Sequence, residues 1–220
     1  MEAPLNDGIA VYGYAMAALA YGGLVVYLLL SGRLIGLDRR SGGTLLAALG
    51  ATAIWSGAQL LSELWPTRAL EPWAALLDLL RYGLWFVFLQ SLFRTADGAV
   101  PPLAVRVLRG VSLLSLGAGA AMLLANLDGS YRSLSAPQIA ASLMLPVCGL
   151  LVVEQLFRNL GEDSRWNAKP VCLALGCVYV FDIYLFSEAL LFGRFDEDAF
   201  NMRGAAHALA VPLLLSLIHI

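Results

Sequence analysis

The chain has 220 residues, of which 60% are hydrophobic and 14% are charged, and its formal net charge at pH 7 is −2. Its mean hydropathy is +0.75. This composition is far from that of a soluble domain and is typical of a protein that crosses a membrane several times. A soluble core of this size is therefore excluded, a lipid bilayer is the expected surrounding, and no nucleic-acid partner is expected.

Seven strongly apolar stretches approach the length that a bilayer requires, which is about 20 predominantly apolar residues. They lie near Ile9–Leu30, Thr44–Leu61, Trp73–Phe93, Val111–Leu127, Ile139–Phe157, Val171–Phe192 and Ala205–Ile220. The loops between them are short, which favours antiparallel neighbouring helices and leaves no room for a soluble domain. The sequence therefore predicts an all-α fold, a polytopic membrane helix bundle with seven transmembrane helices.

Basic residues alternate between the two sides of this predicted bundle. The loops after the first, third and fifth spans hold nine of them: Arg33, Arg39, Arg40, Arg94, Arg106, Arg109, Arg158, Arg165 and Lys169. The other side holds four: Arg68, Arg132, Arg194 and Arg203. Short loops rich in Lys and Arg remain in the cytoplasm. The pattern thus predicts that the amino terminus is outside, that the carboxyl terminus is cytoplasmic and that Arg203 lies in an outer loop.

Charged residues inside the predicted spans are the clearest candidates for a functional site. A charge at the centre of a bilayer costs about 2.5 to 3.5 kcal/mol on insertion scales, so it tends to face a partner or a wet cavity. Asp78 and Arg81 are three residues apart in the third span and therefore share a helix face, where they can pair. Two interpretations remain open: an ion pair that locks the helices together, or a pair that reorganises when a ligand binds.

Further polar residues lie in the outer half of the predicted bundle. Asp182 and Glu188 belong to the sixth span, Tyr184 shares a face with Glu188, and Glu63 closes the second span. Asp182 and Glu188 point about 120° apart around a helix, so they cannot both reach one small ligand unaided. The residues predict either a ligand-binding or proton-sensing pocket, or acids that pair with Arg81 or reach outward to solvent.

Several classes of chemistry leave no trace in the sequence. It contains no Walker phosphate loop, no helix with paired metal-binding histidines and no G-x-S-x-G elbow. The only lysine, Lys169, lies in a predicted inner loop, which excludes a retinal Schiff base in the last span. No catalytic residue, metal ligand or cofactor site is predicted within this chain.

The second half of the chain carries a series of recognisable segments: RWNAKP at 165–170, FDIYLFSEALLF at 181–192, FDEDAFNMRG at 195–204 and HALAVPL at 207–213. Together with YGLWFVFL at 82–89, they resemble the membrane region of the PrsK family, the histidine kinases associated with exosortase and PEP-CTERM protein sorting. The resemblance extends over the chain up to Leu214.

This resemblance implies the membrane region of a dimeric two-component sensor kinase in the bacterial inner membrane. A kinase core using ATP and Mg²⁺ would follow it in the chain. That core would act on a cytoplasmic response regulator that controls exopolysaccharide and PEP-CTERM genes. Neither His207 nor His219 fits the role of the phosphoacceptor histidine, so no catalytic residue is carried over.

The last six residues, Leu215 to Ile220, are what a common sequencing-adapter end encodes. We therefore expect residues 1–214 to form a sensory or anchoring membrane domain and residues 215–220 to be an adapter translation in a truncated gene model. The rival hypothesis is a stand-alone seven-helix transporter, or a membrane partner subunit, that uses the intramembrane acids in a proton or substrate path.

Overall fold

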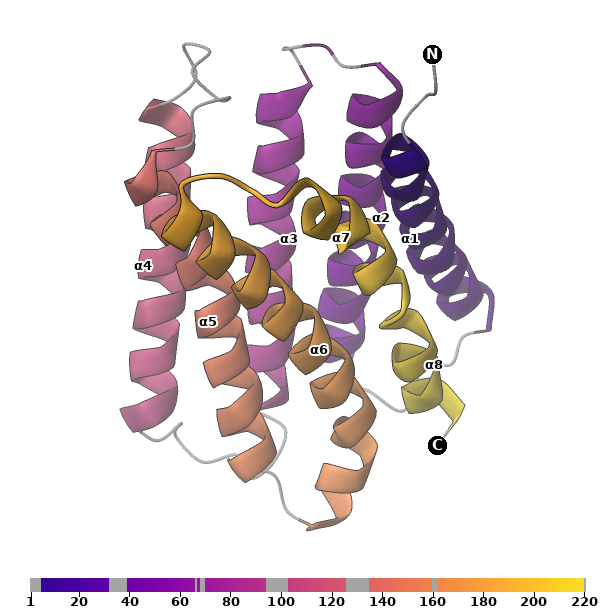
Figure 1. Cartoon of the computed structure of the whole chain (residues 1–220). Helices are drawn as coiled ribbons and strands as arrows, with labels where there is room; N and C mark the ends of the chain where they lie inside the picture. Colours follow the sequence, from indigo (N-terminus) through magenta and orange to yellow (C-terminus); the bar gives the residue numbers. More distant parts are fainter. Residues whose placement is uncertain are drawn as a thin grey trace.

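The structure is a computed structural model that describes residues 5–31, 39–65, 67, 70–93, 103–125, 135–159 and 162–219. Its described residues form helices and short connections, with no strand among them. The helices are α1 (Leu5–Ser31), α2 (Arg39–Leu64), α3 (Glu71–Leu92), α4 (Leu103–Ala125), α5 (Ala136–Asn159), α6 (Glu162–Phe192), α7 (Glu197–Ala208) and α8 (Val211–His219). Figure 1 shows them as a single bundle.

Six of these helices, α1 to α6, are long and apolar enough to cross a membrane. They overlap the first six predicted spans, and the largest differences are at the starts of α4 and α6, which lie eight and nine residues before the predicted apolar stretches. Helices of 22 to 31 residues measure about 33 to 46 Å at 1.5 Å per residue, which exceeds the roughly 30 Å of a hydrocarbon core. The prediction of an all-helical fold is confirmed for the described residues, and six of its helices have the length and composition that crossing a membrane requires.

Neighbours in the sequence are neighbours in the bundle, because each helix from α1 to α6 packs against the next one. Aromatic side chains of α3 and α6 fill the centre, where Tyr82 stacks on Tyr179 with ring centroids 5.9 Å apart. Trp85 lies beside them and donates a hydrogen bond from Nε1 to the Thr52 hydroxyl of α2, at 3.0 Å. The large buried rings therefore join α2 and α3 to α6.

The predicted seventh span is not one long helix. Residues 205–219 are divided between α7 and α8, with a turn at Leu209 and Ala210. Pro212 explains the break, because it has no amide hydrogen to donate and its ring clashes with the carbonyl group four residues earlier in a continuous helix. With nine residues, α8 is about 14 Å long, less than half of a hydrocarbon core. Ile220 lies outside the described residues.

Helix α7 packs closely against α1, and α8 continues along α6. In Figure 1 the connection after α6 crosses one end of the bundle, and α7 and α8 then return toward the other end. Two glycines allow the close approach: a Cβ atom built on Gly204 would lie 2.5 Å from the backbone nitrogen of Tyr14, and one on Gly13 would lie 2.8 Å from that of Ala205. No larger residue fits either position without separating the two helices.

Candidate functional site: a buried ionic cluster

Five ionisable side chains from three helices meet inside the bundle. Asp78 and Arg81 come from α3, Asp182 from α6, and Arg203 and His207 from α7. Apart from Asp78, each of them is at most 3% exposed. We call these five residues the ionic cluster.

Asp78 joins the two arginines. Its Oδ1 accepts hydrogen bonds from Nε and Nη2 of Arg81, at 3.0 and 2.6 Å. Its Oδ2 accepts one from Nη2 of Arg203, at 3.0 Å. The first contact lies within α3 and the second connects α3 to α7. One carboxylate therefore fixes α7 to the centre of the bundle.

Asp182 makes the matching contacts from α6. Its Oδ1 accepts a hydrogen bond from Nε of Arg203 at 2.8 Å, and its Oδ2 accepts one from Nη2 of the same residue at 3.3 Å. The hydroxyl group of Tyr82 donates to Oδ2, and Nη2 of Arg81 lies 3.5 Å from that oxygen. Two carboxylates thus alternate with two guanidinium groups in a closed ring, whose formal charges cancel.

His207 occupies the side of the ring toward α1 and α2. Its Nδ1 lies 3.2 Å from Nη1 of Arg81, and its Nε2 lies 3.6 Å from Oδ2 of Asp182. A guanidinium group can only donate, so Nδ1 is assigned as the acceptor and the ring proton is placed on Nε2, toward the carboxylate. This assignment makes His207 neutral and keeps the net charge of the ionic cluster at zero.

Aromatic rings close the ionic cluster off from lipid. The guanidinium carbons of Arg81 and Arg203 lie 4.3 and 5.0 Å from the ring centroid of Trp55, which belongs to α2. The His207 ring lies 4.9 Å from the same ring. Cation–π contacts of this kind stabilise a desolvated cation by roughly 2 kcal/mol. The hydroxyl of Tyr21 on α1 also donates to the backbone carbonyl of His207, at 3.2 Å.

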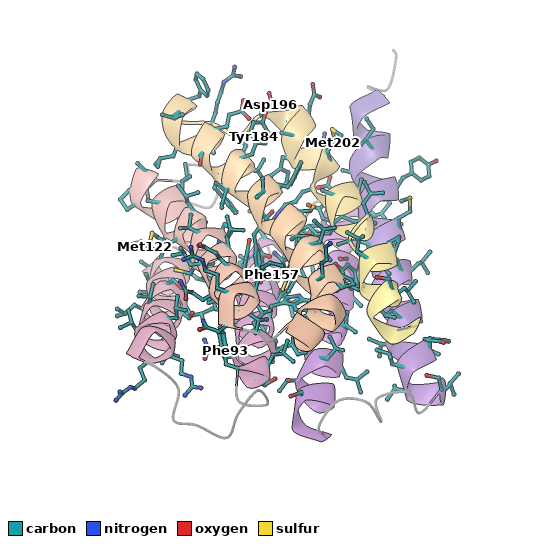
Figure 2. The ribbon with its side chains drawn as sticks, turned by 90° about the horizontal axis from the view of Figure 1, so that it is seen from below. Phe93, Met122, Phe157, Tyr184, Asp196 and Met202 are labelled. Carbon is teal, nitrogen blue, oxygen red and sulfur yellow. The ribbon has the colours of Figure 1, made fainter. Side chains whose placement is uncertain are left out.

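The structure confirms the pairing of Asp78 with Arg81 that their spacing predicts. It also places Asp182 against Arg81, one of the alternatives predicted for that acid. The remaining predicted site residues lie elsewhere. Tyr184 and Glu63 are exposed, and Glu188 is half-buried. Figure 2 shows Tyr184 and Asp196 at the edge of the bundle.

Glu188 borders a separate polar hollow at the connection between α6 and α7. This hollow is also lined by Phe192, Arg194, Asp196, Glu197 and Asp198. Asp182 faces the ionic cluster instead, as expected from the angle of about 120° between the two side chains on one helix. Asp182 and Glu188 therefore do not line one common hollow.

The prediction for Arg203 is wrong, because this residue is buried in α7 rather than placed in an outer loop. Its polar neighbours in sequence give the segment the composition of a loop. A helix-start signal was nevertheless present: the Asp196 carboxylate accepts a hydrogen bond from the Ala199 amide at 2.9 Å, and Glu197 and Asp198 follow in the first turn. Arg203 and His207 are four residues apart and so lie on one face of that helix.

Only some of the other basic residues that predict the orientation of the bundle belong to the described residues. Arg33, Arg68, Arg94 and Arg132 lie outside the described residues. Arg106, Arg158, Lys169 and Arg194 are exposed in the described part of the bundle. Arg158 pairs with Glu154 at 3.6 Å outside the ionic cluster, and both side chains are exposed.

The ionic cluster is suited to holding helices together rather than to bond-breaking chemistry. Both oxygens of each carboxylate already accept hydrogen bonds from arginine, so neither carboxylate presents a vacant pair of oxygens to a cation. Among the described residues, no group of three or more His, Cys, Asp or Glu side chains is placed to hold a metal ion.

No protein-family model, no curated protein and no solved structure is significantly similar to this chain. Whatever family is assigned to it therefore depends on the residues themselves and on the geometry of the bundle.

Proposed function

We propose that the chain is the sensory and anchoring membrane domain of a histidine kinase similar to the PrsK family, with the kinase core following Leu214 in the native chain. In this proposal the bundle crosses the bacterial inner membrane seven times, α7 and α8 together making the last crossing. The amino terminus is outside and the carboxyl end is cytoplasmic. The kinase would act as a dimer on a response regulator of exopolysaccharide and PEP-CTERM genes, with ATP and Mg²⁺ bound by its core.

The observation that supports this proposal best is the attachment of α7. This short helix directly precedes α8, and it is connected to α3 and α6 through Arg203, which contacts Asp78 and Asp182. A change in either contact would shift α7 and, through it, α8, from which a cytoplasmic domain would continue.

The energies involved are of the right size for a switch. Moving a two-state equilibrium from 1:99 to 99:1 requires about 5.5 kcal/mol of differential binding. Breaking a buried ion pair costs roughly 3–5 kcal/mol. A stimulus that favours an arrangement with one altered ion pair in the ionic cluster would therefore change the populations of the two states substantially.

The first test is to sequence the native locus across the codon for Leu214 with long reads. The proposal expects an open reading frame that continues into a phosphoacceptor histidine and an ATP-binding kinase core. A genuine stop codon near Ile220 would contradict it and would favour a stand-alone transporter or a partner subunit. Substrate flux in vesicles would then distinguish those two.

A further inference from the structure

A small cavity lies directly beside the ionic cluster, on the side toward α4 and α5. Its volume is about 80 Å³. Polar groups line part of it: the side chains of Asp78 and Tyr82 on α3, and those of Gln138 and Ser142 on α5. Met122 of α4, labelled in Figure 2, contributes to the apolar remainder.

The side-chain oxygen of Gln138, which lines this cavity, lacks a hydrogen-bond donor among the described residues. The residue is only 5% exposed, and its Oε1 atom has no hydrogen-bond partner among the described residues. A buried amide oxygen in native proteins is almost always paired with a protein group or with ordered water. No described protein group reaches Oε1, and a donor held in the cavity would satisfy it.

The cavity has the size and polarity to hold water. One water molecule needs about 10–15 Å³ of cavity volume measured for a water-sized probe, and it needs two to four polar partners. The observed volume therefore accommodates several molecules, and the lining supplies carboxylate, hydroxyl and amide groups. Cavities of similar size with wholly apolar walls remain empty.

We propose that this cavity holds a cluster of ordered water molecules, which hydrogen-bond to Gln138 and Asp78 and provide the solvent contact of the ionic cluster. Asp78 keeps 18% of its side chain exposed, whereas Asp182 is fully buried. Asp78 is thus the member of the ionic cluster that meets water. This inference is independent of whether a kinase core follows the chain.

Hydroxyl-radical labelling by synchrotron X-rays tests the inference on the unmodified protein, because radicals form from bound water and oxidise the side chains beside it. Tyr82 lines the cavity and Tyr21 does not, although both are 1% exposed. In purified protein in lipid nanodiscs, we expect Tyr82 to be oxidised several-fold faster than Tyr21. Equal rates for the two tyrosines would overturn the proposal.

A cavity-filling variant gives the second readout. Ala141 lines the cavity and is buried, so Ala141→Leu should displace the water. We expect the oxidation rate of Tyr82 to fall to that of Tyr21, while the rate of Tyr21 stays unchanged. A folded variant whose Tyr82 is still oxidised at the native rate would contradict the assignment of the water to this cavity. If the variant does not fold, the comparison within the native protein decides alone.

Discussion

Each carboxylate of the ionic cluster has two arginine neighbours, and this arrangement determines what a single substitution does. Removing Asp182 leaves Arg81 and Arg203 with only the Asp78 carboxylate between them. The ring then carries an uncompensated positive charge inside the bundle. Removing an acid together with an arginine leaves a balanced pair.

We predict that Asp182→Asn lowers the free energy of unfolding by about 3–5 kcal/mol, the usual cost of breaking a buried ion pair. Thermal unfolding in detergent, followed by tryptophan fluorescence, measures the loss. Asp182→Asn combined with Arg203→Gln should recover a substantial part of it, because Asp78 and Arg81 remain paired. If the double variant lost as much unfolding free energy as the two single variants together, the charge balance of the ring would not explain its stability.

Glu154→Gln is the matched control for charge removal. It breaks an ion pair with Arg158 in which both side chains are largely exposed. Exposed pairs contribute about 0–1 kcal/mol, so this variant should unfold at nearly the native temperature.

For single side chains, the sequence predicted the contacts within one helix better than the contacts between helices. The spacing of Asp78 and Arg81 determines that they share a face, and they do pair. The contacts of Arg203 depend on α7 folding back over α3 and α6, with a sequence separation of 125 residues to Asp78. No local pattern encodes a contact of that range.

At the scale of the helices, the packing of α7 is sensitive to single residues. Its contact with α1 depends on two glycines that leave no space for a side chain. The glycines bring Arg203 and His207 close enough to reach α3 and α6.

We predict that Gly204→Ala lowers the unfolding temperature, since a new Cβ atom 2.5 Å from the Tyr14 backbone must push α7 away from α1. Overpacking of this kind typically costs about 1–3 kcal/mol. Gly22→Ala is the control on α1, because a Cβ atom there meets nothing within 4 Å. It should be neutral, or stabilising by up to about 1 kcal/mol through helix propensity. Equal behaviour of the two variants would show that the close approach does not matter for stability.

Hydrophobicity predicted the existence of α1 to α6 because each contains a nearly continuous apolar run. It failed for α7, which carries the polar residues Glu197, Asp198, Asn201 and Arg203. A helix that buries charges against other charges does not have the apolar stripe on which the prediction depends. Its acidic first turn and its Asp196 cap were the usable signals.

For the whole molecule, the distribution of basic residues predicts how the bundle is oriented in the membrane. Fusions after Asn159 should place a reporter in the cytoplasm, and fusions after Gly193 should place it outside. Green fluorescent protein should therefore fluoresce at the first position, and alkaline phosphatase should be active at the second. The reverse pattern would show that the basic loops do not determine the orientation.

In the proposed function, the ionic cluster controls α7 and, through it, α8, from which a cytoplasmic kinase would continue. The autophosphorylation rate of the full-length protein in proteoliposomes tests this control, with Asp182→Asn compared against Glu154→Gln. We expect the first variant to insert normally and to change the rate several-fold, because α7 loses its contact with α6, while the second variant keeps the native rate. An inserted and folded Asp182→Asn protein with the native rate would contradict the claim, and would leave the bundle as an anchor alone.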